Sequence, residues 1–126
     1  AALGGAVGQG TATIVNFSSG QGLQPFARRS VYAASKAGVI AFSKCIAIEW
    51  APAIRVNTIC PGATDTPMVR AGYDAATLRE QVGPRYALGR IARADEVAHA
   101  ALYLTGAESS FVAGIALAVD GGRSFH

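Results

Sequence analysis

The stretch TATIVNFSSG, residues 11–20, decides how the chain is interpreted. Its first seven residues are apolar or β-branched except Asn16 and predict a short buried strand, and the Ser-Ser-Gly that follows predicts a loop. From about Ser30 to Trp50 the apolar positions recur broadly around a helix, which favours burial on more than one face, and Pro52 ends that helix. IRVNTIC at 54–60 predicts a second strand, which the dipeptide Pro61-Gly62 terminates.

The carboxyl-terminal part continues the same alternation. Thr66 to about Arg90 contains several prolines and glycines and predicts a mobile helix and loop over a site. Asp95–Leu104 predicts an amphipathic helix that is capped near Ala94 or Asp95. Ile115–Val119 predicts a last apolar strand, closed by Asp-Gly-Gly. This order predicts an α/β fold with about three parallel strands and flanking helices, the carboxyl-terminal portion of a Rossmann-like doubly wound sheet.

Composition indicates a small domain that associates with something else. The chain has 126 residues, of which 51% are hydrophobic and 15% charged, whereas a soluble domain averages about 25% charged residues. We therefore expect an apolar surface that a partner covers. The net charge is +3, but the basic residues are scattered and only Arg28 and Arg29 are adjacent, so we expect no nucleic-acid or lipid surface.

The first 27 residues carry no charge, yet the glycines and the polar Asn16, Ser18 and Ser19 interrupt them. Neither a membrane-spanning helix nor a signal peptide is predicted there. Two cysteines, Cys45 and Cys60, are too few for a disulfide scaffold, so we expect a reducing, cytoplasmic compartment. The two histidines lie far from the cysteines, and no metal site is expected.

Ser19, Tyr32 and Lys36 form the most informative cluster. Ser19 ends a strand, and Tyr32 and Lys36 are four residues apart near the start of the next helix, hence on one helix face. A phenol titrates near pH 10 unless a cation stabilises the phenolate, and Lys36 is placed to do so. Together with a Ser19 hydrogen bond, the pair would polarise a carbonyl and exchange its proton. An ordinary exposed Tyr-Lys pair remains the alternative at this point.

The wider context resembles the short-chain dehydrogenase/reductase family, and its oxoacyl-carrier-protein reductase-like group. The resemblance runs from Thr11 to Gly122 and rests on NFSSGQG, the thirteen residues from Ser19 to Tyr32, YAASK, RVNTICPGATDTPM and VAGIALAVDGG. It implies transfer of hydride between NAD or NADP and a small ketone or secondary alcohol. It further implies that Ser19 orients the substrate oxygen, that Tyr32 is the acid-base, and that Lys36 lowers the tyrosine pKa and binds the nicotinamide ribose.

The same resemblance implies further binding residues. The loop from Pro61 to Thr66 is similar to the family segment that contacts the nicotinamide carboxamide, with Pro61, Gly62, the Thr64 backbone and the Thr66 hydroxyl as contacts. The alternative is that Pro61-Gly62 turns the chain and Thr66 caps a helix, roles that are compatible with cofactor contact. Substrate recognition is expected of Ser19, Gln21, Phe26 and the segment from Met68 to Arg90. Four other matching positions are expected to be structural: Asn57, Asp120, Gly121 and Gly122.

Three family features have no counterpart in these residues: the Gly-rich dinucleotide loop, the selector of the cofactor ribose and a catalytic-relay Asn. Gly4, Gly8 and Gly10 reproduce the glycine spacing, but a strand follows them at once where a helix should begin. We therefore expect residues 1–126 to be the carboxyl-terminal catalytic half of one Rossmann-type domain, without the amino-terminal dinucleotide-binding half. The alternative is a non-catalytic assembly or binding fragment.

The family resemblance also implies dimers or tetramers. Their interfaces would involve the helix Ser30 to Trp50 and the strand Ile115 to Val119. A complementing amino-terminal half is the other partner to consider.

Overall fold

The computed structural model describes residues 12–124, so the glycine cluster at 4–10 lies outside the described residues. Its main sheet contains three parallel strands in the order β1 (Ala12–Phe17), β2 (Ile54–Pro61) and β5 (Ala116–Val119). The register places Ala12 opposite Ile54 and Phe17 opposite Ile59. The predicted parallel α/β architecture is confirmed.

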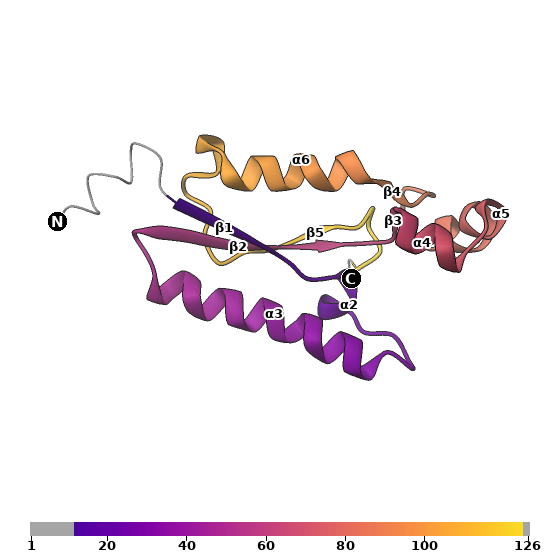
Figure 1. The fold of residues 1–126 in the computed structure, drawn as a ribbon, viewed down its shortest axis with the longest axis horizontal. Helices are drawn as coiled ribbons and strands as arrows, with labels where there is room; N and C mark the ends of the chain where they lie inside the picture. Colours follow the sequence, from indigo (N-terminus) through magenta and orange to yellow (C-terminus); the bar gives the residue numbers. More distant parts are fainter. Residues whose placement is uncertain (1–11, 125–126) are drawn as a thin grey trace.

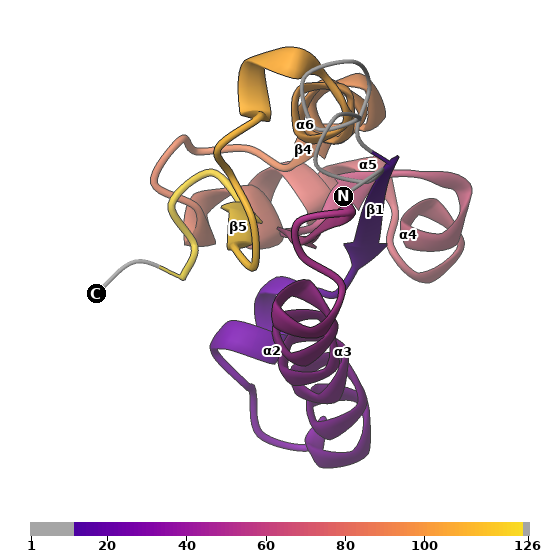
Figure 2. The ribbon, with the colours of Figure 1, turned by 90° about the vertical axis from the view of Figure 1, so that its left-hand side faces the viewer.

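Helices cover both faces of this sheet. Helix α3 (Ser30–Glu49) lies on one side and helix α6 (Ala94–Thr105) on the other, and the view in Figure 2 separates the two layers. A short helix α2 (Gly20–Leu23) lies beside α3 after the end of β1 (Figure 1). The arrangement is that of a doubly wound sheet, in which loops at the carboxyl ends of the strands form the site.

Alternation along the strands divides the core into two clusters. Ile14, Ile54 and Val56 pack against Ile46 and Ala47 of α3. The opposite face of the sheet packs against α6 through a second cluster, which includes Val15, Ile59, Val97, Leu104 and Leu117. Successive side chains of a strand point to opposite faces, so β1 and β2 each contribute to both clusters, whereas β5 contributes Leu117 and Val119 to the second.

Helix α3 is buried on one face in this chain, and the expectation of burial on more than one face is not met by the chain alone. Ala33, Ile40, Ser43, Ile46 and Ala47 are buried, whereas the exposed large side chains include Val31, Phe42 and Ile48. By length and composition alone α3 could cross a membrane. Its packing on the sheet, together with a 2.9 Å hydrogen bond from Asn16 Nδ2 to Ser43 Oγ, is that of a core helix.

The predicted element boundaries are close to the observed ones, with small differences. Helix α6 begins at Ala94, but its N-cap is Arg93, so the predicted cap at Ala94 or Asp95 is wrong. The Glu96 carboxylate supplies the capping contact by accepting a 2.8 Å hydrogen bond from the Arg93 backbone N–H. Strand β2 extends through Pro61, one residue further than predicted.

The segment between β2 and α6 is more structured than the predicted helix and loop. After a short strand β3 (Thr64–Asp65) it forms α4 (Pro67–Gly72), α5 (Ala75–Thr77) and two irregular turns, η1 (Leu78–Val82) and η2 (Gly83–Arg85). Strand β4 (Ala92–Arg93) then pairs in parallel with β3. A final turn, η3 (Ala107–Ser109), connects α6 towards β5.

Candidate active site

The site begins where β1 ends against α3. Ser18 is 6% exposed, its N–H donates to the Ile59 carbonyl at 2.8 Å, and its Oγ donates to the Lys36 carbonyl at 2.7 Å. These bonds fix the first turns of α3 relative to the strand ends. Cys60 lies beside this anchor, and burial raises the pKa of its thiol.

Ser19 follows at the mouth of the site, in extended conformation, as the N-cap of α2. Its Oγ accepts a 3.1 Å hydrogen bond from the Gln21 backbone N–H. A serine hydroxyl has one hydrogen to donate besides its acceptor lone pairs. The capping bond leaves that hydrogen free to reach a ligand oxygen.

Tyr32 and Lys36 share one face of α3, as their spacing predicts. The Lys36 Nζ lies 5.8 Å from the centroid of the Tyr32 ring and donates to the Phe17 carbonyl at 3.4 Å. The bond to Phe17 holds the ammonium at the end of β1, close to the phenol. Tyr32 is 42% exposed, so its ring is accessible from the cleft.

A cleft of about 530 Å³ brings most of the predicted residues together. Lys36 does not line it; its Nζ lies over the ring of Tyr32, which does. Gln21 and Phe26, the predicted substrate contacts besides Ser19, line this cleft. Residues of the segment that begins at Met68 line it as well. The predicted site residues that line the cleft are Ser19, Gln21, Phe26, Tyr32, Pro61, Gly62, Thr64 and Thr66.

The loop from Pro61 to Thr66 is held by contacts that keep its backbone against β5. Tyr86 Oη accepts a 2.8 Å hydrogen bond from the Ala63 N–H. A Cβ on Gly62 would lie 2.8 Å from Tyr86 Cε1 and 3.0 Å from Asp120 Cα, so a side chain does not fit there. The glycine at this position is therefore required by close packing.

The two threonines of this loop play different local roles. Thr64 Oγ1 donates to the Gly62 carbonyl at 3.0 Å. Thr66 is the N-cap of α4, and its Oγ1 accepts from the Val69 N–H at 3.4 Å. The capping alternative is thus confirmed for Thr66, and its hydroxyl hydrogen stays available to a ligand in the same cleft.

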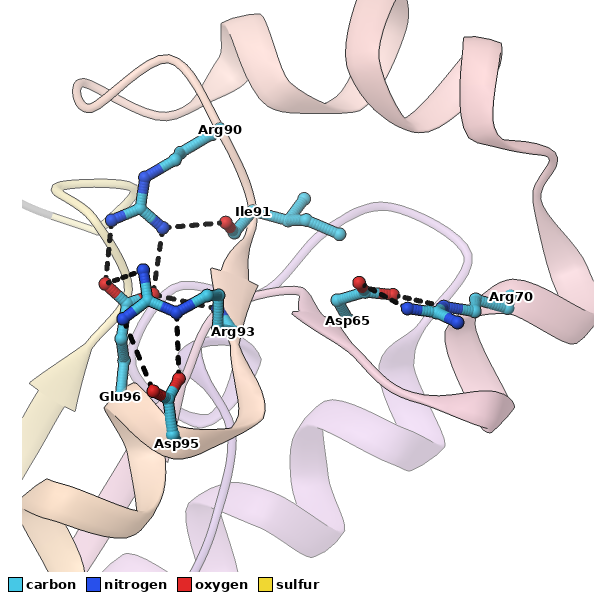
Figure 3. A network of polar contacts seen from close by, with 7 residues as sticks. All are labelled: Asp65, Arg70, Arg90, Ile91, Arg93, Asp95 and Glu96. Carbon is cyan, nitrogen blue, oxygen red and sulfur yellow. Dashed lines mark hydrogen bonds and ion pairs between the residues drawn. The ribbon is translucent and has the colours of Figure 1, made fainter.

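Ion pairs fix the β3–β4 side of the site (Figure 3). Arg70 Nε donates to Asp65 Oδ1 at 2.5 Å, and the hydrogen bond from Arg70 lowers the pKa of that carboxyl. Arg90 binds both oxygens of Glu96, at 2.7 and 2.8 Å. This bond, with the Arg93 N–H, lowers the pKa of Glu96 to about 2. The Arg90–Glu96 pair ties the segment before β4 to the start of α6.

The four positions expected to be structural were Asn57, Asp120, Gly121 and Gly122. Asn57 is 1% exposed; its Nδ2 donates to the Val112 carbonyl at 2.9 Å, and its Oδ1 accepts from the Ile115 N–H at 3.1 Å. Gly121 and Gly122 have φ of 55° and 77°, backbone angles that favour glycine.

Sequence reasoning missed the supporting residues. Ser18 and Tyr86 act through hydrogen bonds that are distant in sequence. Arg55 donates to the carbonyls of Val112 and Leu104 at 2.9 and 3.2 Å. None of these bonds has a short-range signal, because each joins segments that only the sheet topology brings together.

Comparison with known proteins agrees with this geometry. The family model described as enoyl-(acyl carrier protein) reductase matches residues 1–124. An uncharacterized short-chain type dehydrogenase/reductase from Sinorhizobium fredii is 47% identical over 117 residues, which are 88% of this chain and 21% of that protein. The chain therefore belongs to the short-chain dehydrogenase/reductase family.

Two solved structures are particularly similar. Ligand-free aldohexose dehydrogenase from Thermoplasma acidophilum superimposes with a TM-score of 0.86 at 36% identity, over 95% of this chain and 51% of that one. 3-Ketoacyl-(acyl-carrier-protein) reductase from Brucella melitensis, complexed with NADH, gives 0.80 at 36% identity, over 96% of this chain and 47% of that one. The chain spans about half the length of these two relatives.

Proposed function

We propose that the cleft is the substrate side of an NAD(P)-dependent oxidoreductase, which transfers hydride between a nicotinamide and a ketone or secondary alcohol. The observation that carries the proposal is the convergence of Ser19, Tyr32 and the Pro61–Thr66 loop on one cleft. The Lys36 Nζ lies 5.8 Å from the centroid of the Tyr32 ring. The family's short-chain dehydrogenases and reductases, including the NADH complex of the Brucella reductase, support it.

Each of the three side chains has a distinct part in the proposal. In reduction, the Tyr32 hydroxyl gives its proton to the carbonyl oxygen as the carbinol forms, and in oxidation the phenolate takes that proton back. Ser19 donates its free hydroxyl hydrogen to the same oxygen and holds it in place. The Lys36 ammonium, 5.8 Å from the centroid of the Tyr32 ring, places a positive charge near the negative charge that develops on the phenol oxygen during proton transfer.

The residues present fit the nicotinamide end of the cofactor. The Thr66 hydroxyl and the Pro61-Gly62 backbone line the cleft beside Tyr32. The amide oxygens of Gln21 and Gln24 are buried in the same region and accept no hydrogen bond within residues 12–124. A carboxamide and ribose hydroxyls supply the donors that such acceptors need. When bound, the nicotinamide supplies or accepts the hydride.

A second candidate function, a non-catalytic assembly or binding module, rests on the apolar surface of α3. Val31 is 84% exposed and Ile48 81%, and within residues 12–124 strand β1 pairs with β2 alone. We infer that another copy of the chain, as a dimer or tetramer, or a complementing polypeptide covers these surfaces. Sedimentation velocity tests this, since a stable monomer at micromolar concentration would contradict it.

We also infer a cytoplasmic location, for which the free Cys45 and Cys60 are the support.

Isotope transfer tests the catalytic proposal. The intact protein is incubated with NADH or NADPH deuterated at the nicotinamide C4 and with ethyl acetoacetate or cyclohexanone. The proposal predicts deuterium on the carbinol carbon of the product, observed by NMR. Failure to bind either cofactor in a calorimetric titration, together with absence of labelled alcohol, would favour the assembly function instead.

A further inference from the structure

The charge in the cleft is one-sided. Arg29, Arg85 and Arg123 all line it, and Asp120 is the one carboxylate among the lining residues. Asp120 is 7% exposed, and its oxygens accept from the backbone N–H groups of Gly122 and Ser124 at 3.1 and 2.9 Å. Its charge is therefore already bound within the turn that follows β5.

The three arginines differ from the other arginines around the site. Within the described part of the chain, ion pairs use Arg70, Arg79, Arg90 and Arg93. No carboxylate in residues 12–124 lies within ion-pair distance of the three that line the cleft. Arg29 and Arg85 are exposed and Arg123 is half-buried. Three guanidinium groups around one cleft, with no carboxylate partner among the described residues, give it a positive potential that attracts anions.

Two of these arginines adjoin predicted site residues, Arg29 along the start of α3 and Arg123 through a contact with Phe26. Arg29 is the N-cap residue of α3 and lies three residues before Tyr32. The Arg123 guanidinium stacks 4.8 Å from the centroid of the Phe26 ring, and its Nη1 donates to the Arg85 carbonyl at 3.5 Å. A guanidinium has five N–H donors, so Arg123 is held in place with most of its donors unused.

Apolar side chains also line the cleft: Met68, Val69, Leu78 and Val82. A ligand with a short carbon skeleton and a charged end matches this mixed lining. Building on the proposed oxidoreductase function, we propose that the substrate is an anion, a ketone or secondary alcohol that carries a carboxylate or phosphate bound by Arg29, Arg85 and Arg123. Arginine suits this role because its planar donors bind both oxygens of a carboxylate or phosphate.

A matched pair of ketones tests the proposal on the intact protein. Levulinate and methyl levulinate carry the same carbonyl and differ in charge. The proposal predicts that kcat/KM for levulinate exceeds that for the ester by about 10- to 100-fold, the size expected of hydrogen bonds to a charged group. A third probe, acetoacetyl-coenzyme A, carries its phosphates far from the carbonyl. A preference for this probe over levulinate would assign the charge to a long phosphate-bearing carrier.

Variants locate the effect. Arg123→Gln lowers kcat/KM for levulinate far more than for the ester, and Arg85→Gln is a second variant in case the first does not fold. Arg79→Gln is the matched control, because Arg79 pairs with Glu80 outside this cleft, and it leaves the ratio between the two probes unchanged. Equal kcat/KM for the two ketones, or a ratio that neither cleft variant changes, would overturn the proposal.

A binding measurement separates this proposal from the catalytic one. Saturation-transfer NMR reports binding of levulinate and methyl levulinate whether or not either is reduced. Binding of levulinate that Arg123→Gln weakens, without turnover, would support the anion site and contradict the oxidoreductase function. Turnover of methyl levulinate but not of levulinate would support the oxidoreductase function and contradict the anion site.

Discussion

Replacing Gly22 with alanine tests how closely α2 must approach α3 for the site to form. A Cβ at Gly22 would lie 2.7 Å from Ser18 Oγ, 2.9 Å from the Lys36 carbonyl carbon and 3.0 Å from its oxygen. Two of these atoms are helix backbone and cannot rotate away. The methyl group therefore either moves α2 from α3 or breaks the 2.7 Å bond between Ser18 Oγ and the Lys36 carbonyl.

The cost can be worked from those two effects. Overpacking a close contact costs about 1–3 kcal/mol, and losing a hydrogen bond costs about 0.5–1.5 kcal/mol. We expect Gly22→Ala to lower the free energy of unfolding by about 2–4 kcal/mol. With a urea slope of about 2 kcal/mol per M, the midpoint of unfolding falls by roughly 1–2 M. Urea unfolding followed by far-UV circular dichroism measures it.

Gly38 is the matched control, because it lies in the middle of α3 with nothing within 4 Å of an added Cβ. Gly38→Ala should raise stability by about 0.5–1 kcal/mol, since alanine is the better helix former. The same Gly→Ala change is thus expected to lower the free energy of unfolding at Gly22 and to raise it at Gly38. If both variants unfold at the same urea concentration, the close approach of α2 to α3 is not as the structure has it.

Two further predictions concern the core and the ion-pair network. Ile59→Ala should lower the free energy of unfolding by about 2–5 kcal/mol because Ile59 is fully buried. Leu102→Ala is the control: Leu102 is 69% exposed on α6, so the free energy should change by less than about 0.5 kcal/mol. Equal losses in urea unfolding would contradict the assigned core. Glu96 has its pKa lowered to about 2 by Arg90, so its contribution to stability is complete above about pH 4.5 and is lost as pH falls towards 2. Wild type should therefore lose more stability than Glu96→Gln between about pH 5 and pH 2, and parallel losses would show that the bond to Arg90 does not form.

Local sequence patterns were sufficient for the order and type of the main elements. Short runs rich in apolar and β-branched residues at 11–17 and 54–60, together with the Pro52 and Pro61-Gly62 breaks, define the strands and the helix between them. The spacing of Tyr32 and Lys36 was enough to place them on one face, because a helix repeats every 3.6 residues.

The details that were not predicted depend on contacts between distant segments. The capping of α6 at Arg93 follows from the return of the Glu96 carboxylate. Glu at N3 is a capping-box signal, but Arg is not a usual N-cap residue, so the boundary was not recognised. Tyr86 reaches the Ala63 N–H across 23 positions of sequence. The composition and the family resemblance pointed to an interface on α3, but periodicity did not show which of its apolar side chains the sheet covers and which stay exposed.

The central claim, that Tyr32 is the acid-base of a hydride-transfer site, is tested most directly by Tyr32→Phe in the intact protein. Tyr103 on α6 is the matched control, because it is 44% exposed against 42% for Tyr32 and does not line the cleft. The account predicts that Tyr32→Phe lowers kcat for ketone reduction by about 100-fold or more, with an unchanged circular dichroism spectrum, while Tyr103→Phe keeps wild-type turnover. Wild-type turnover in a folded Tyr32→Phe protein would contradict the claim.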